Sequence, residues 1–276
     1  MPSSTSSDAP FKVYAADHSA AVLRNHNRRT VLSSAPHLLP HLKPTQRILD
    51  VGCGPGSITI DLARRLPDGH VTGLEYVADP LAQARERAAS EGLSNIDFVV
   101  GDIHSLDYAD ESFDVVHAHQ VLQHVADPVL ALREMRRVLK SGSGMVSDRE
   151  SADWTWYPPS AGLTAWSDLL RKVTDSRGGH LHPGSWIQAW AAEAGFSREK
   201  IECSAGTELY STPAERKFYS EMMAERVVGT AFSRNAIEGG FATQEELEGM
   251  AKAWKEWAEN KDGWFAVWHG AVICHV

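Results

Sequence analysis

The chain has 276 residues, 43% hydrophobic and 23% charged, an ordinary composition for a globular protein with a sizeable core. Its 27 Lys and Arg against 36 Asp and Glu give a net charge of −9, which opposes binding to nucleic-acid phosphates, and no apolar run is long enough for membrane insertion. Three sparse cysteines without CxxC spacing disfavour a disulfide framework or a zinc site and favour a reducing, cytoplasmic location.

The first half of the chain alternates between two patterns. Residues 1–10 are predicted to be a disordered tail and residues 11–43 a mostly helical leader. Over residues 44–150, short apolar runs alternate with segments of helical spacing, which indicates βαβ units and a parallel sheet. The predicted strands lie at 48–51, 71–74, 96–100, 113–118 and 144–148, and the predicted helices at 57–66, 79–91 and 127–139.

The second half has a different composition. The segment 151–203 is predicted to begin with a long irregular cover over 151–183. One helix and a weak strand follow it. Capping boxes begun by Thr212 and Thr243 predict helices within a cap insert at 204–262. Residues 263–276 predict a terminal strand. We expect one domain over 11–276, with the insert covering the sheet.

A glycine loop, DVGCGPGS at residues 50–57, is the most informative segment. It follows a predicted strand and precedes a helix, and glycines there let the backbone approach a ligand. Its GxGxG spacing differs from the GxGxxG of dinucleotide sites and lacks the GK[ST] of a P-loop. Asp50 beside the loop suits an amine-bearing ligand and opposes a pyrophosphate. The alternative is a tight turn without a ligand.

Acidic residues also end the next two predicted strands. Glu75 can accept hydrogen bonds from both hydroxyls of a ribose, and Asp102 can accept one from an adenine amino group. The alternatives are a solvated charge for Glu75 and a helix cap for Asp102. The fourth strand ends in FDVVHAHQVLQHV, residues 113–125, beside the same crevice.

With these motifs, the chain resembles class I S-adenosylmethionine (SAM)-dependent methyltransferases, in the branch related to ubiquinone and menaquinone C-methyltransferases. The resemblance is carried by ILDVGCGPG, GLEYV, GDIHSLDYADESFDVVHAHQVLQHVADP and ALREMRRVLKSGSG, and it covers about residues 44–150. It implies an α/β fold with a doubly wound, seven-stranded, mostly parallel Rossmann-like sheet, whose antiparallel last strand is inserted next to the sixth. It also implies SAM as the cofactor.

Position by position, the resemblance implies a set of cofactor contacts. Gly52, Gly54 and Gly56 would line the methionine and ribose, Asp50 would neighbour the methionine amine, and Glu75 would hold the ribose. Tyr76 would flank the adenine, and Asp102 and Ile103 would bind the polar atoms of the adenine. His119 and Gln120 would lie near the transferred methyl, and Tyr14, with His18 and Arg24, would fold over the cofactor.

Methyl transfer from a sulfonium is an in-line displacement that depends on alignment and on excluding water. A base is needed only when the acceptor must lose a proton. Our catalytic candidates are His119, Gln120 as a hydrogen-bonding orienter, and Glu150, expected just past the fifth strand and facing the crevice. The alternatives are a backbone contact for His119 and a salt bridge with Arg149 for Glu150. We expect no metal site.

Nine tryptophans supply flat apolar walls, and we expect Trp154, Trp156 and Trp268 to bind an aromatic or polycyclic acceptor. The alternative is that they attach the cap helices to the sheet. The predicted cap insert at 204–262 and the negative net charge favour a small-molecule substrate over a nucleic-acid partner. The sequence gives no signal of the oligomeric state.

The resemblance extends to fungal enzymes that S-methylate reduced dithiol metabolites of the gliotoxin type. A thiol acceptor in secondary metabolism is therefore the first specific hypothesis. C- or O-methylation of a quinone or polyketide is the alternative. A regulatory protein that binds SAM without turnover is the alternative from another class.

Overall fold

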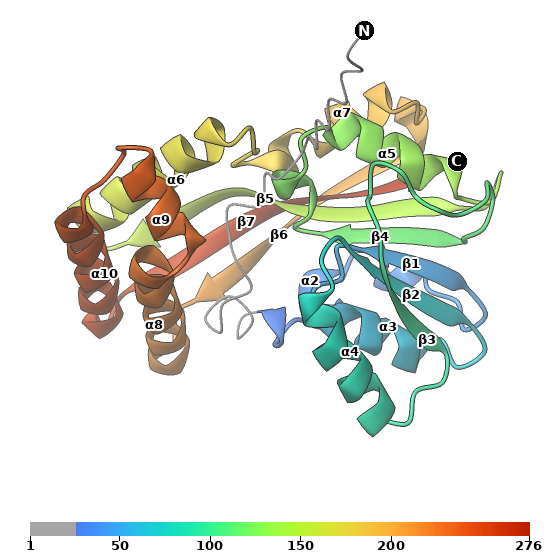
Figure 1. Ribbon diagram of the computed structural model, residues 1–276, viewed down its shortest axis with the longest axis horizontal. Coiled ribbons are helices and arrows are strands. Elements are labelled where there is room, and N and C mark those ends of the chain that lie inside the picture. Colours follow the sequence, from blue (N-terminus) through green and yellow to red (C-terminus); the bar gives the residue numbers. More distant parts are fainter. Residues whose placement is uncertain (1–25) are drawn as a thin grey trace, which may run out of the picture.

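A computed structural model describes residues 26–276 (Figure 1). The predicted tail, most of the leader, and the cofactor candidates Tyr14, His18 and Arg24 lie outside the described residues. Within 26–43 the regular elements are short, namely α2 (Val31–Ser34) and the 3-10 turn η1 (Leu39–His41). The expectation of a mostly helical leader is therefore wrong for this part, where Pro36 and Pro40 prevent a longer helix.

The seven strands form one sheet in the order β3-β2-β1-β4-β5-β7-β6. Their bounds are β1 (Arg47–Val51), β2 (His70–Glu75), β3 (Ile96–Val100), β4 (Val115–His119), β5 (Met145–Tyr157), β6 (Ile201–Tyr210) and β7 (Trp264–His275). The first five strands are parallel, and β7 runs antiparallel between β5 and β6. The predicted fold class is confirmed.

Helices cover both faces of this sheet because successive strand residues point to opposite sides. Ile48 packs with α3 (Ser57–Arg65) on one face, and its neighbour Leu49 packs with α5 (Pro128–Arg137) on the other. The remaining helices of this part are α4 (Asp79–Ser90) and α7 (Ile187–Glu193), with the 3-10 turns η2 (Leu122–His124), η3 (Pro183–Ser185) and η4 (Arg198–Lys200).

The predicted irregular cover over 151–183 is wrong. Strand β5 continues to Tyr157, and Ser160 then caps the 16-residue helix α6 (Ala161–Ser176) by accepting a hydrogen bond from the Leu163 amide. Strand β6 likewise continues to Tyr210, so the helical insert begins at Pro213 and not at residue 204. The long β7 pairs with both strands along their length, which holds these polar and aromatic stretches extended.

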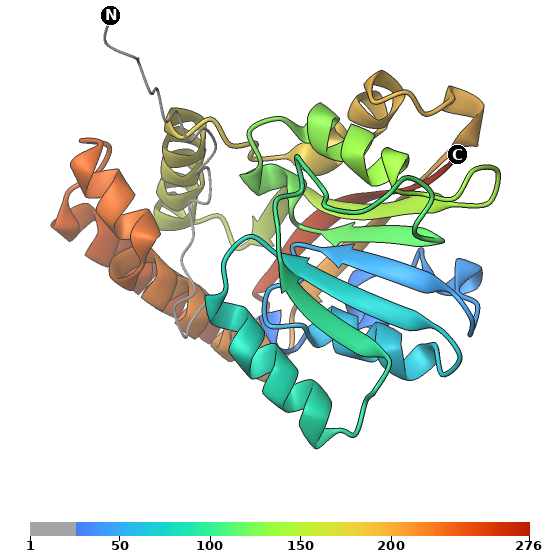
Figure 2. The same cartoon turned by 45° about the vertical axis from the view of Figure 1, so that its right-hand side comes forward.

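Helices from the second half of the chain pack on one face of this strand extension. They lie at the end of the molecule away from β3 (Figures 1 and 2). They are α6, α8 (Pro213–Gly229), α9 (Ala231–Glu238) and α10 (Gln244–Glu259). The capping boxes of Thr212 and Thr243 are confirmed, whereas the short α9 was not predicted. We call α6 and α8–α10 the helical cap. Among residues 26–276, no helix combines the length and apolarity that a membrane span requires.

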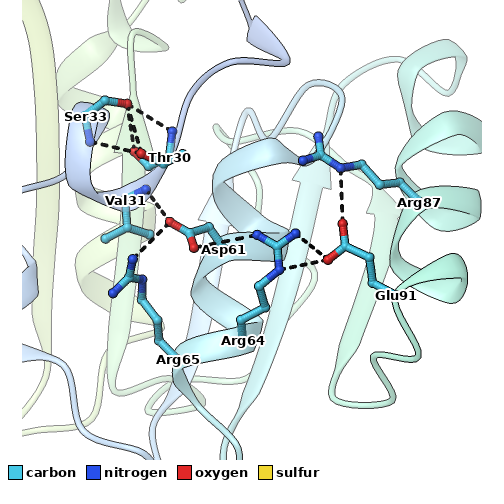
Figure 3. A network of polar contacts seen from close by, with 8 residues as sticks. All are labelled: Thr30, Val31, Ser33, Asp61, Arg64, Arg65, Arg87 and Glu91. Atoms are coloured by element: carbon cyan, nitrogen blue, oxygen red, sulfur yellow. Dashed lines mark hydrogen bonds and ion pairs between the residues drawn. The ribbon is translucent and has the colours of Figure 1, made fainter.

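The end of the leader is attached to the sheet domain through Asp61 on α3 (Figure 3). Asp61 Oδ2 accepts a hydrogen bond from the Val31 amide at 2.8 Å and contacts Arg65 at 3.4 Å. Ser57 Oγ also donates to the carbonyl of His26 at 2.6 Å. These contacts hold residues 26–31 beside the glycine loop.

Candidate functional site

Two adjoining cavities lie at the carboxyl ends of the parallel strands. The larger has a volume of about 770 Å³, and the smaller, of about 180 Å³, lies between the helical cap and the strand extension. We call them the large cavity and the cap chamber. Both are lined by His26, Arg29, Gln120, Gln123 and His124. A ligand in one cavity can therefore contact a ligand in the other across this boundary.

The glycine loop shapes the floor of the large cavity. All three glycines have positive φ, which other residues rarely adopt. A Cβ on Gly54 would meet nothing within 4 Å, so this residue faces open space. A Cβ on Gly52 would lie 2.4 Å from Val121 Cγ2, and Gly56 does not line the cavity but packs α3 closely against Phe98. Two of the three predicted glycines therefore face the ligand space.

Acidic and aromatic residues at the ends of β2 and β3 form one side of the large cavity. Glu75 Oε2 accepts from the Gly54 amide at 3.0 Å, and Oε1 accepts from the Tyr76 amide at 2.8 Å. The predicted residues Tyr76, Asp102 and Ile103 also line this cavity. Asp102 Oδ1 is held by the amide and Nδ1 of His104, at 2.9 and 2.8 Å. We missed His104, although its position two residues after Asp102 favours such a turn.

Asp50 is a buried carboxyl group that lines the large cavity. Its Oδ2 accepts a hydrogen bond from Thr59 Oγ1 at 2.6 Å. Burial raises the pKa of Asp50 to about 7, partly offset by the Thr59 hydrogen bond, and the nearby Glu75 carboxylate raises it further. Asp50 therefore changes its charge near neutral pH.

Gln120 stands at the boundary between the two cavities, in a backbone conformation with φ of 56° that is uncommon for residues other than glycine. Its Oε1 accepts from Arg29, and its Nε2 lies 3.1 Å from His269 Nε2. Burial, with Arg149 and Arg29 nearby, lowers the pKa of His269 to about 3, so its ring accepts this hydrogen bond. We missed both Arg29 and His269.

His119 lines only the large cavity. Burial, together with the charges of Arg29 and Arg149, holds the pKa of His119 well below its usual value. The imidazole is therefore neutral and weakly basic.

Glu150 does not face the crevice, contrary to our expectation. It lies within β5, is fully buried, and lines neither cavity. Its Oε1 accepts from the amides of Val121 and Leu122 at 2.7 and 2.6 Å, and burial raises its pKa well above the usual value. Strand alternation points Arg149 to the opposite face, so the two do not pair. Glu150 fixes the segment that follows Gln120.

The three predicted acceptor residues have different surroundings. Trp154 lines the cap chamber and donates from Nε1 to Ser167 Oγ at 3.1 Å. Trp156 points to the same face but lies nearly parallel to Phe265, with ring centroids 6.0 Å apart, and lines neither cavity. Trp268 points to the opposite face and is 47% exposed. Of the three, only Trp154 contacts the proposed acceptor space.

The cap chamber also contains residues that we missed. From α8 come Tyr219, Met222, Met223 and Arg226, and from β6 come Glu208 and Tyr210. The spacing of the α8 residues, at i, i+3, i+4 and i+7, is the signal of one helix face. Within residues 26–276, no group of three or more His, Cys, Asp or Glu residues is arranged to hold a metal ion.

Comparisons with known proteins identify the family of this chain. The family model described as a methyltransferase domain matches residues 42–190. A Schizosaccharomyces pombe protein named as an uncharacterized methyltransferase is 32% identical over 272 residues, covering 94% of this chain and 95% of the relative. A Staphylococcus aureus demethylmenaquinone methyltransferase is 41% identical over 110 residues, covering 40% of this chain and 44% of the relative.

The fold is also similar to that of solved methyltransferases. Haemonchus contortus phosphoethanolamine N-methyltransferase 2, crystallised with SAM, matches with a TM-score of 0.56 and 22% identity. The match covers 91% of this chain and 52% of that protein.

Proposed function

The chain belongs to the SAM-dependent methyltransferase family, and we propose that it methylates a small, largely apolar acceptor held in the cap chamber. The observation that carries this proposal is the pair of adjoining cavities that share Gln120. One has the size that SAM needs and is lined by the carboxyl groups of Asp50, Glu75 and Asp102. The other is walled by aromatic and methionine side chains, which suit an apolar molecule.

The large cavity fits SAM in three places. Glu75 presents a carboxylate for the ribose hydroxyls, and the open space at Gly54 admits the ligand to the backbone. Asp102 faces the place proposed for the adenine, and Asp50 that for the methionine amine. When bound, SAM supplies a methyl group on a positively charged sulfur. A lone pair of the acceptor would attack this methyl group from the side opposite the sulfur, and the sulfur would keep the electrons of the broken bond.

The residues of this chain act mainly by orientation. Gln120, held by Arg29 and His269, would position the reacting groups at the boundary. His119, His124 and His180 are poor bases, because burial lowers the pKa of each. An acceptor that ionises easily suits such a site. We therefore propose a thiol of a reduced dithiol metabolite as the acceptor, since a free thiol has a pKa near 8.5.

C- or O-methylation of a quinone or polyketide is the second candidate. It is supported by the similarity of part of this chain to a demethylmenaquinone methyltransferase. We also propose a cytoplasmic location, because Cys53, Cys203 and Cys274 are all free thiols.

The test is to incubate the protein with methyl-labelled SAM and a fungal metabolite extract, with and without a thiol reductant, and to follow the label by mass spectrometry. A labelled product that needs the reductant is the expected result. A product that forms equally without reductant would favour the quinone or polyketide alternative. No labelled product would contradict the proposed acceptor class.

Binding of SAM should weaken at acidic pH because of Asp50. A pKa of about 7 leaves this carboxyl mostly protonated at pH 6 and mostly ionised at pH 7.5, and only the ionised form attracts the ligand's ammonium group. We expect the Kd of SAM to be roughly five- to tenfold higher at pH 6 than at pH 7.5. Titration calorimetry measures it. Asp50→Asn should flatten this dependence, and an unchanged dependence would refute the assignment.

Replacing Trp154 by alanine should impair acceptor use and spare cofactor binding. The ring lines the cap chamber and lies 5.5 Å from the ring of Trp166. Loss of this wall should raise the KM of the acceptor about tenfold or more. The exposed Trp268→Ala is the matched control and should behave as wild type. Equal losses of SAM binding and acceptor use in Trp154→Ala would overturn this placement.

A further inference from the structure

We propose that the acceptor binds in the cap chamber as an anion and that Arg226 is the cation that binds it. This inference rests on the proposed function and specifies its substrate class as a thiolate, phenolate or similar ionised nucleophile. Arg226 comes from α8 and lines the chamber together with the aromatic and methionine side chains of the same helix. Its side chain is half-buried, so its charge is only partly solvated.

The structure provides no counter-ion for this guanidinium within residues 26–276. No hydrogen bond or ion pair joins its side chain to another described residue. Glu208 on β6 is the one carboxylate among the described residues that line the chamber, and no contact within 4 Å pairs it with Arg226. Glu208 instead lies close to Tyr210 and Arg149. After burial, its charge is the next cause that raises the pKa of Tyr210, and it partly offsets the burial that lowers the pKa of Arg149.

The other titratable groups that face the chamber do not supply a negative charge. Burial, then the charges of Arg226 and Arg29, lowers the pKa of His124 to about 3. Burial alone lowers the pKa of His180, and burial raises that of the Tyr219 phenol. These groups are therefore neutral near pH 7. Burial, and then the charge of Glu208, also raises the pKa of the Tyr210 phenol. The remaining titratable groups are His26 and the cation Arg29, both at the boundary with the large cavity.

A cation in a chamber with apolar walls attracts an anion more strongly than it would in water, because the local dielectric is low. The effect of Arg226 on the pKa of His124 places its charge within electrostatic range of the boundary that both cavities share. An ionised nucleophile bound there reacts without a side-chain base, which agrees with the weak basicity of the histidines. The proton of the free acceptor is released to solvent before binding or on binding.

The test uses 4-nitrophenol as a probe, because its anion absorbs at a longer wavelength than the neutral phenol. Full-length protein is saturated with S-adenosylhomocysteine, and the ionised fraction of the bound probe is followed from pH 5 to 9. We expect the apparent pKa of the bound phenol to fall by about one or more, and its Kd at neutral pH to rise roughly tenfold or more in Arg226→Met. Arg226→Lys should restore much of the effect.

Lys217→Met is the matched control, since it removes an exposed cation from the same helix. The control should leave both quantities unchanged, and calorimetry should show that every variant binds S-adenosylhomocysteine as wild type does. Binding of the neutral phenol, or equal binding in wild type and Arg226→Met, would overturn the anion proposal and leave the proposed function standing. Probe binding that Trp154→Ala does not change, or no binding at all, would overturn both.

Discussion

Replacing Glu75 by alanine is expected to weaken SAM binding about a hundredfold while the protein stays folded. The carboxylate ends β2 with one oxygen on the Gly54 amide and the other on the Tyr76 amide, and it lines the large cavity. Two charge-assisted hydrogen bonds to a ribose contribute roughly 3 kcal/mol, which corresponds to this factor. Titration calorimetry gives the Kd directly.

The control for this variant is Glu86→Ala, which removes an exposed carboxylate from α4. It should bind SAM as wild type does. Circular dichroism and thermal melting should show that Glu75→Ala retains the fold, because Glu75 belongs to the cavity wall and not to the apolar core. A folded Glu75→Ala variant with unchanged affinity would mean that the ribose binds elsewhere.

The second large effect is expected from Trp254→Ala in the helical cap. Trp254 is fully buried on α10. The centroid of its ring lies 5.0 Å from that of Trp166 on α6 and 5.2 Å from that of Phe265 on β7. Removing such a ring leaves a cavity and costs about 3–5 kcal/mol of unfolding free energy. We expect Tm to fall by roughly 10 °C. Acceptor turnover and SAM binding should be lost together, at a lower temperature than in wild type.

Trp186→Ala is the matched control, because this tryptophan is 60% exposed. It should change the unfolding free energy by less than about 0.5 kcal/mol. Calorimetric melting of both variants also tests the expectation of one domain. One shifted transition agrees with a cap that unfolds together with the sheet, and two separate transitions would contradict it. An unshifted Tm in Trp254→Ala would refute the role of its ring in the cap core.

The sheet was predictable where the sequence carries local signals. Strands β1 to β4 are short apolar runs followed by turn residues, and the loop at Gly52–Gly54 has a spacing that distinguishes its ligand class. The extended part of β5 and β6 was not predictable in this way. Its polar and aromatic residues form strands because β7 lies between them, which is a long-range pairing that propensity does not encode.

The cap chamber was predicted less well for a related reason. The face of the sheet on which a strand residue lies depends on the register of the strand. A register shift between Ser151 and Asp153 places Trp154 on the face that lines the cap chamber. Glu150 lies just before that shift and points into the core. Arg226 belongs to a helix that was predicted, but only the packing of α8 against the strand extension shows that it faces the acceptor space.

The most direct test of this account is a crystal structure of the chain with S-adenosylhomocysteine. We expect ribose hydroxyls within hydrogen-bond distance of Glu75, adenine beside Asp102 and Ile103, and the sulfur facing the cap chamber across Gln120. A ligand bound with its sulfur turned away from that chamber, or bound outside the large cavity, would contradict it.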